Sequence, residues 1–358
     1  MKTSVLRGVS GSVLLIAMML TSISCSEREL IPLQVGLTRS VSKLPFIIAL
    51  DQGLYEKYGL DIEVRLRDPE FEGAIELPST NLFPKAWRKL REMSSNEPLF
   101  DPQIEVAGAN GRIAGITMHS KARHLISIAA TDCVVRTHIV AKKGIERVED
   151  LVGLRIGVSS TISNSGFVGL LLAERMGWDP IQDISLLTKG NNMESLRSGR
   201  VDAFVADERS YAIAIQEGYP ILLATSSWGE ALAGNSVNVE PQWLEDPNNR
   251  EAMRRFLQAT IEGIAIFHQN RELALDVMAR WHGVTDRAIA EIVYEEGSQI
   301  PRKPFPCYAG ITNAMKVYDS NGMRKYSLQD FYDDELMKEL DESGFIDSFY
   351  ESATPSTP

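Results

Sequence analysis

A regular alternation of strand-like and helix-like segments over residues 138–224 constrains the fold most strongly. The strand-like segments are "THIVAKK", "LRIGVS", "VDAFVA" and "PILLAT", and the helix-like segments between them are 167–176, "NNMESLRSG" and "ERSYAIAIQEG". Parallel strands need long crossover connections, which are usually helices. The alternation therefore predicts an α/β protein with mostly parallel sheets flanked by helices.

The segments on either side of this block complement one another. The N-terminal half offers the strands "LQVGL", "LDIEVRL" and "IEVAGA", whereas the chain after Trp228 offers three helices over 250–268, 272–281 and 286–296. The buried stripe expected on the first of these helices comprises Met253, Phe256, Leu257, Ile261 and Ile264. Asn270 and Thr285 are expected to cap the second and third helices. Because amphipathic helices need a sheet to cover, we expect the late helices to pack on the early strands. Between them, residues 68–103 are rich in proline, and "KAWRKLREM" predicts a basic helix.

The N-terminus is typical of an export signal. Lys2 and Arg7 precede an apolar run over 13–20, and Cys25 follows a short polar segment. A cysteine at this position indicates a bacterial lipoprotein signal, so residues 1–25 are expected to be the signal peptide with Cys25 as the lipidated residue. Plain secretion is the alternative, since Ser22 stands where such signals usually carry an aliphatic residue.

Charge and cysteine content exclude some classes of protein. The 358-residue chain has a net charge of −11, so we expect no nucleic-acid partner. After Cys25 only Cys133 and Cys307 remain, and two cysteines do not make a disulfide framework. Export would permit a disulfide, but we expect two small buried apolar residues.

Four stretches carry a family resemblance: "LPFIIALDQGLYEKYGLDIEV", "VAKKGIERVEDLVGLRIGVSS", "LRSGRVDAFVADE" and the helical segment from Asn248 onward. Together they resemble the exported substrate-binding proteins of ABC importers, in particular the nitrate, sulfonate, taurine and thiamine-precursor binders. The resemblance implies a two-lobed periplasmic-binding-protein fold of type II that closes on a small molecule. Lobe 1 would comprise 31–136 and 235–340, lobe 2 would comprise 140–230, and 341–358 would be a tail. The hinge crossings would lie near 137–141 and 225–237.

Candidate ligand contacts follow from the strand ends, because ligands of open α/β sheets bind beyond the carboxyl ends of the strands. The candidates are Thr38, Arg39 and Ser40 after the first strand, Asn110 and Gly111 after "IEVAGA", Ser159, Ser160, Thr161, Ser163, Asn164 and Ser165 after "LRIGVS", Asp207 after "VDAFVA", and Trp228 beside the second crossing.

The serine-rich loop is the strongest of these candidates. It leads into a helix whose first N–H groups and positive dipole end suit an anion. The alternative is that Ser163 or Asn164 only caps that helix. One cap needs one such residue, so a loop with six small polar side chains favours contact with a ligand.

The other candidates have equally plain structural alternatives. Arg39 either pairs with a carboxylate or sulfonate or is an exposed loop residue. Asp207 either binds an amine or a ring nitrogen or caps the next helix, which we favour. Trp228 either stacks on a ring or packs the hinge. Near the first crossing, Asp132 and Arg136 are expected to pair.

No enzyme motif accompanies these features. The sequence contains no Gly-x-Ser-x-Gly elbow, no Walker loop and no His-Glu-x-x-His, and no Cys/His cluster has metal spacing. We therefore expect a monomeric binding protein without metal or cofactor. It would be held to a membrane by its lipid anchor, and it would deliver a small anion such as a sulfonate to an ABC permease and its ATPase. The alternatives are an enzyme on the same fold, of the thiamine-pyrimidine or menaquinone-pathway type, and a solute sensor with a membrane partner.

Overall fold

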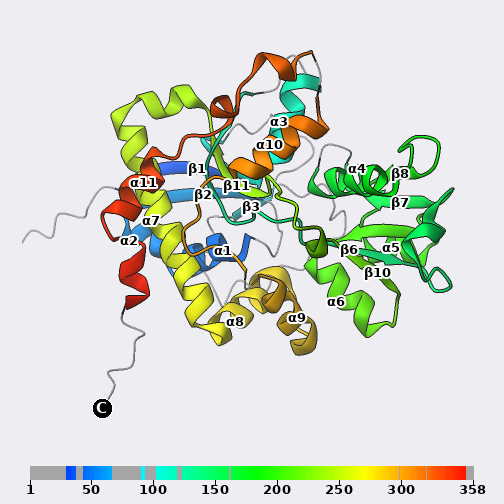
Figure 1. The fold of residues 1–358 in the computed structure, drawn as a ribbon. Coiled ribbons are helices and arrows are strands. Elements are labelled where there is room, and N and C mark those ends of the chain that lie inside the picture. The colour runs from blue at the N-terminus through cyan, green and yellow to red at the C-terminus, as the bar shows by residue number, and fades with distance from the viewer. Residues whose placement is uncertain are drawn as a thin grey trace, which may run out of the picture.

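Two β-sheets divide the chain into two lobes (Figure 1). The computed structural model describes residues 30–37, 43–66, 90–92, 102–118, 123–160, 163–297, 299–319 and 321–351. Among these residues, the first sheet has six strands in the order β3-β2-β1-β4-β11-β5, and the second has five in the order β10-β6-β9-β7-β8. We call the parts of the chain around these sheets lobe 1 and lobe 2.

The sheet of lobe 1 joins early strands to a late one. Its strands are β1 (Ile31–Leu37), β2 (Leu60–Leu66), β3 (Leu90–Glu92), β4 (Ile104–Gly108), β5 (Ile126–Ala130) and β11 (Asn235–Val239). Strand β1 pairs in parallel with β2 and β4, whereas β11 runs antiparallel between β4 and β5. Strand β2 has one buried apolar face, which carries Leu60, Ile62 and Val64, whereas Asp61 on its other face is exposed.

Strand β3 corrects part of the expectation for the proline-rich segment. Residues 90–92 pair in parallel with β2, at the edge of the sheet, instead of lying in a basic helix. The remaining residues of "KAWRKLREM" lie outside the described residues.

Eight α-helices of the described chain belong to lobe 1. They are α1 (Leu44–Asp51), α2 (Leu54–Lys57), α3 (Ala109–Met118), α7 (Pro247–Gln269), α8 (Arg271–His282), α9 (Arg287–Gly297), α10 (Tyr308–Val317) and α11 (Glu335–Glu342). The long helix α7 packs on α1 and α8. Its buried face contains the expected stripe, which includes Phe256, Leu257 and Ile261, each fully buried. Late helices therefore cover an early sheet, as predicted.

Helix caps and the C-terminal end differ from the prediction in two places. Asn270 caps α8 as expected, because its side chain accepts a hydrogen bond from the Leu273 N–H at 3.1 Å. At α9 the cap is Asp286 rather than Thr285, since the Asp286 carboxylate accepts from the next helical N–H groups. The tail predicted from 341 starts later, because α11 continues to Glu342 and Ile346 is fully buried.

Lobe 2 forms a second layered unit. Its strands are β6 (His138–Ala141), β7 (Arg155–Val158), β8 (Ser185–Thr188), β9 (Ala203–Ala206) and β10 (Ile221–Ala224), and its helices are α4 (Asn164–Met176), α5 (Met193–Arg197) and α6 (Glu208–Gln216). All four residues of both β6 and β9 are buried, which is typical of strands covered on both faces. Strands β7, β8 and β9 are parallel, and β6 is antiparallel to both of its neighbours.

Asp202 joins the strands of lobe 2 at one end of the sheet. The Arg155 guanidinium donates to its carboxylate at 2.8 and 3.1 Å, and Lys142 also pairs with it. These cations lower the pKa of Asp202, so the carboxylate stays ionised although it is almost fully buried.

The two crossings between the lobes run side by side. They cover residues 131–137 and 225–234 and are joined by backbone hydrogen bonds, including those from the Val135 N–H to the Glu230 carbonyl and from the Leu232 N–H to the Cys133 carbonyl. Cys133 also forms a disulfide with Cys307, the N-cap residue of α10. The expectation of two unpaired buried cysteines is therefore wrong.

Among the described helices, none is both long and apolar enough to cross a membrane. The predicted signal peptide and Cys25 lie outside the described residues.

Candidate functional site

Three helices begin where the two lobes face each other. Strands β4, β7 and β9 are each followed by a helix, α3, α4 and α6 respectively. Helix α3 of lobe 1 contacts α4 of lobe 2, and α6 of lobe 2 contacts α9 of lobe 1. Figure 1 shows α6 and α9 side by side at the boundary between the lobes. The strand ends thus bring helix N-termini to the lobe boundary, where this class of sheet binds ligands.

Two asparagines at this boundary carry unpartnered amide atoms. Asn110 is fully buried, and within the described structure neither its Oδ1 nor its Nδ2 has a hydrogen-bond partner. The buried Oδ1 of Asn164 is also unpartnered there. A methyl group built on Gly108 would lie 2.7 Å from that Oδ1, so Asn164 of lobe 2 lies against the end of β4 in lobe 1. Buried amide groups without partners are costly, which marks both side chains as candidate ligand contacts.

The serines of the α4 loop bond mainly to one another. Ser163 caps α4, because its Oγ accepts from the Gly166 N–H at 3.1 Å and also donates to the Ser160 carbonyl at 2.7 Å. Ser165 Oγ accepts from the Ser159 N–H at 2.9 Å and donates to the Ser159 Oγ at 3.2 Å. This network fixes the loop shape, so the hydroxyls both cap the helix and hold Asn164 at the lobe boundary.

The remaining predicted contacts are distributed differently. Gly111 lies inside α3, beside Asn110, and not in a loop. Asp207 is exposed and caps α6 by accepting from the Ser210 N–H at 2.7 Å. Trp228 packs against the lobe 2 core, with the Arg175 guanidinium 5.1 Å from its ring centroid. The predicted contacts Thr38, Arg39, Ser40 and Thr161 lie outside the described residues.

Charged residues cluster at the first crossing. The expected pair is confirmed, because Arg136 Nη2 lies 3.2 Å from Asp132 Oδ1. Burial nevertheless raises the pKa of Asp132, against the opposing effects of Arg136 and the buried Lys43. Burial also raises the pKa of Glu296, on α9.

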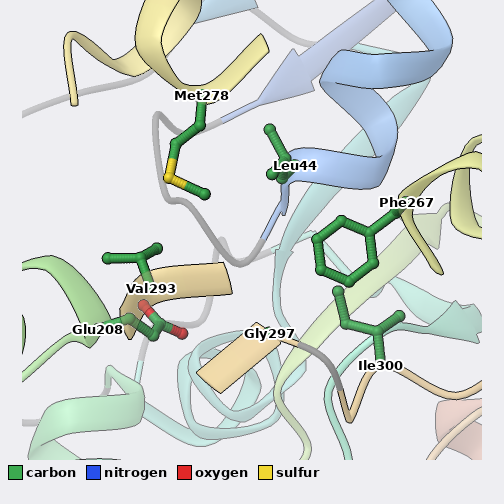
Figure 2. Close-up of a pocket in the computed structure, with 7 residues that line it drawn as sticks. All are labelled: Leu44, Glu208, Phe267, Met278, Val293, Gly297 and Ile300. Atoms are coloured by element: carbon green, nitrogen blue, oxygen red, sulfur yellow. The ribbon is translucent and has the colours of Figure 1, made fainter. Parts of the chain in front are cut away.

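Glu208 is a further candidate contact at the lobe boundary, next to the predicted Asp207. It is the first residue of α6, directly after the cap Asp207, and its carboxylate enters a pocket at the lobe boundary. Figure 2 shows this carboxylate among apolar side chains. Burial raises the pKa of Glu208 to about 7, and the negative charges of Asp207 and Asp132 add to the shift. In the sequence, Glu208 follows the same strand as Asp207 and is therefore placed at the same strand end.

Among the described residues, no group of three His, Cys, Asp or Glu side chains is arranged to hold a metal ion.

Comparisons with known proteins agree with this architecture. Residues 115–274 match the family model described as NMT1/THI5 like. No curated protein sequence gives a significant match. Similar solved structures include the periplasmic aliphatic sulphonate binding protein SsuA from Escherichia coli, at 17% identity and a TM-score of 0.57 over 80% of this chain and 85% of that one.

Two further structures extend the likeness to different functions. The periplasmic nitrate-binding protein NrtA from Synechocystis PCC 6803 has 12% identity and a TM-score of 0.63, over 88% of this chain and 89% of that one. The desulfurization enzyme DSZB has 12% identity and a TM-score of 0.56, over 87% of this chain and 99% of that one. The fold predicted from the sequence is confirmed: this chain has the two-lobed α/β fold of the periplasmic binding proteins, and its middle part matches the NMT1/THI5-like family.

Proposed function

We propose that this chain is the solute-binding component of an ABC importer and captures a small anion between its lobes. The observation that carries the proposal is that Asn110 and Asn164, at the N-termini of α3 and α4, both carry buried amide atoms without a partner within the described structure: both amide atoms of Asn110, and Oδ1 of Asn164. The positive dipole end of a helix N-terminus attracts anions, and a bound sulfonate or carboxylate would also accept from the amide Nδ2 atoms. Because the two asparagines belong to different lobes, a shared ligand would stabilise the closed arrangement.

The serine network supports binding over catalysis. Its hydroxyls bond to one another and to backbone groups, whereas a nucleophilic serine needs a base within hydrogen-bond reach. The likeness to DSZB shows that this fold also hosts an enzyme. Each ligand that binds is therefore also tested for chemical conversion by the protein.

A ligand panel with charge-changing variants tests the proposal. Purified protein is screened by thermal shift with alkanesulfonates, carboxylates, nitrate and pyrimidines, and hits are measured by calorimetry. Asn110→Asp is expected to weaken anion binding at least tenfold, because it places a like charge beside the ligand. Asn248→Asp, with the same charge change at an exposed site on α7, is the matched control and should bind as the native protein does. A panel without any hit, or equal affinity of both variants, would refute the proposal.

The cellular context belongs to the same proposal. The protein would be an exported monomer, held at the membrane by a lipid on Cys25, and would deliver its ligand to a permease and its ATPase. Cys25→Ala should release the protein from the membrane fraction, and continued membrane attachment of that variant would show that the anchor is wrong.

A further inference from the structure

The loop that follows β8 is hydrogen-bonded to the serine-rich loop at the strand ends of lobe 2. The Lys189 N–H donates to the Ser159 carbonyl at 3.0 Å. The Ser159 N–H in turn donates to Ser165 Oγ, and the neighbouring Asn164 lies against Gly108 of lobe 1. Lys189 is therefore joined through one residue to the loop that holds Asn164 at the lobe boundary.

The backbone of Lys189 has an unfavourable conformation. Its φ is 56°, and among the described residues it is the one residue other than glycine with a positive φ. Glycine is favoured in this region because a side chain there crowds the backbone. Arg200 holds the turn by donating to the carbonyls of Thr188 and Lys189 at 3.1 and 3.2 Å. The fold thus keeps a lysine where a glycine would be less strained, which indicates a use for its side chain.

The Lys189 ammonium has no counter-charge in the protein. Lys189 is exposed and, within the described part of the chain, forms no ion pair. Lys142 and Arg155 of the same lobe, by contrast, both pair with Asp202. Two residues after Lys189, the buried Oδ1 of Asn191 is also without a hydrogen-bond partner among the described residues. This loop therefore carries an unpaired cation and an unsatisfied polar atom at a strand end.

The local charge at Lys189 suits an anion better than the local charge at Arg209, a second cation at these strand ends. Arg209 directly follows the acids Asp207 and Glu208, which repel an anion there. Residues 185–193, which surround Lys189, contain no acidic residue.

We propose that Lys189 supplies the positive charge that pairs with the anion bound at Asn110 and Asn164. The flexible four-carbon stem of a lysine allows its ammonium to reach across to the serine-rich loop. Charge-assisted hydrogen bonds are stronger than neutral ones. Because the chain has a net charge of −11, a local cation also offsets the repulsion that an anion meets on approach. The inference rests on the proposed function and names the charge partner in the same site.

The test compares two variants of Lys189 with a matched control. Lys189→Gly removes the ammonium and suits the left-handed backbone, whereas Lys189→Arg keeps a positive charge. Lys143→Gln removes an exposed lysine that follows β6, at the opposite end of the lobe 2 strands. The probes are ethanesulfonate, acetate and nitrate, with ethyl methyl sulfone as an uncharged relative of the sulfonate. Affinities are measured by calorimetry at about 50 mM and about 500 mM NaCl.

The inference predicts a specific pattern of affinities. An anion that binds the native protein should bind Lys189→Gly about five- to tenfold more weakly at the lower salt concentration. Its affinity for Lys189→Arg and for Lys143→Gln should stay within about twofold of the native value. The higher salt concentration should weaken binding to the native protein more than binding to Lys189→Gly, because salt screens an exposed charge. The sulfone should not distinguish the four proteins.

Thermal unfolding separates loss of charge from loss of structure. Without ligand, Lys189→Gly should unfold at a higher temperature than the native protein, because the strain of the left-handed lysine is relieved. A variant that is more stable and binds the anion more weakly would support a role of Lys189 in binding. A lower unfolding temperature of this variant would overturn the inference, because Lys189 would then stabilise the loop.

The affinities also separate this inference from the proposed function. If an anion binds Lys189→Gly as tightly as the native protein, or if Lys143→Gln weakens binding equally, Lys189 is not the charge partner and the solute-binding proposal stands. If none of the three anions binds the native protein, the inference fails, and the wider ligand panel then decides the proposed function.

Discussion

Removal of the disulfide between Cys133 and Cys307 should measurably destabilise the protein. The bond joins residues 174 positions apart. For a loop of this length, the chain-entropy relation gives a ceiling of about 5 kcal/mol, and typical native disulfides contribute about 2–4 kcal/mol. At about 2.1 cal/mol/K of unfolding entropy per residue, a loss of 2–5 kcal/mol in this chain corresponds to a Tm lower by about 3–7 °C.

The double variant Cys133→Ser/Cys307→Ser should show this shift in calorimetry at pH 7. The native protein treated with dithiothreitol should unfold at the same temperature as the variant, and the reductant should not change the variant further. Mass spectrometry after alkylation should find no free thiol at either position of the native protein. Free thiols there, or identical unfolding of native and variant protein without reductant, would refute the reasoning.

Three further changes test the stability of lobe 2 and the charge of the pocket. Asp202→Asn should lower the free energy of unfolding by about 2 kcal/mol in urea, because it weakens the pairing with Arg155, and an unchanged midpoint would contradict this role. Since the pKa of Asp202 is lowered in the folded state, that stabilisation is present above pH 3.8 and is lost as the pH falls below it. Glu208 behaves oppositely: its pKa of about 7 lies above the unfolded value, so native stability should fall by about 1–3 kcal/mol between pH 4.5 and 7. In the Glu208→Gln variant, the free energy of unfolding measured in urea should change less between pH 4.5 and 7. An equal pH dependence of this free energy in both proteins would count against a raised pKa of Glu208. Gly157→Ala should cost at least about 2 kcal/mol, because its Cβ would lie 2.1 Å from the Gly190 carbonyl oxygen, whereas a native-like midpoint would show that the backbone can yield.

Local sequence patterns were sufficient for most of the layered architecture. The alternation in β2 and the buried stripe of α7 are set by the requirement to place apolar side chains on one face, and this requirement is visible within each segment. The caps Asn270 and Ser163 were predictable for a similar reason, because a helix N-terminus needs a short polar side chain at one position.

Features that depend on tertiary pairing were not predictable. Strand β3 has only three residues and forms because β2 offers an open edge. The disulfide depends on the fold bringing Cys307 to the first crossing, and nothing near either cysteine in the sequence indicates this. The position of α3, which begins before Asn110, is set by backbone hydrogen bonds from Ala109 and Asn110 to residues 233 and 234.

The choice between two adjacent acids could not be made from sequence either. Asp207 and Glu208 have similar chemistry, and both follow the same strand. The shorter side chain caps the helix because its carboxylate reaches the Ser210 N–H, and the longer one is then directed into the pocket. Both acids therefore lie at the same strand end, and only the structure distinguishes the one that caps the helix from the one that faces the pocket.

Both crossings are fastened to lobe 1, and this determines where the molecule can bend. The disulfide fastens Cys133 to α10, and Gly310 of α10 packs so closely that a methyl group there would lie 2.2 Å from the Leu232 carbonyl carbon. Asn313 of α10 also donates to the Glu230 carboxylate and the Ala231 carbonyl, so a rotation of lobe 2 would be absorbed mainly by residues 134–137 and 225–229. In an oxidising compartment the disulfide would keep the flexible part of the first crossing short. Reduction of the disulfide would release Cys133 from α10 and lengthen that flexible part. The redox state of its surroundings would thus set the angular range over which the two lobes can open and close.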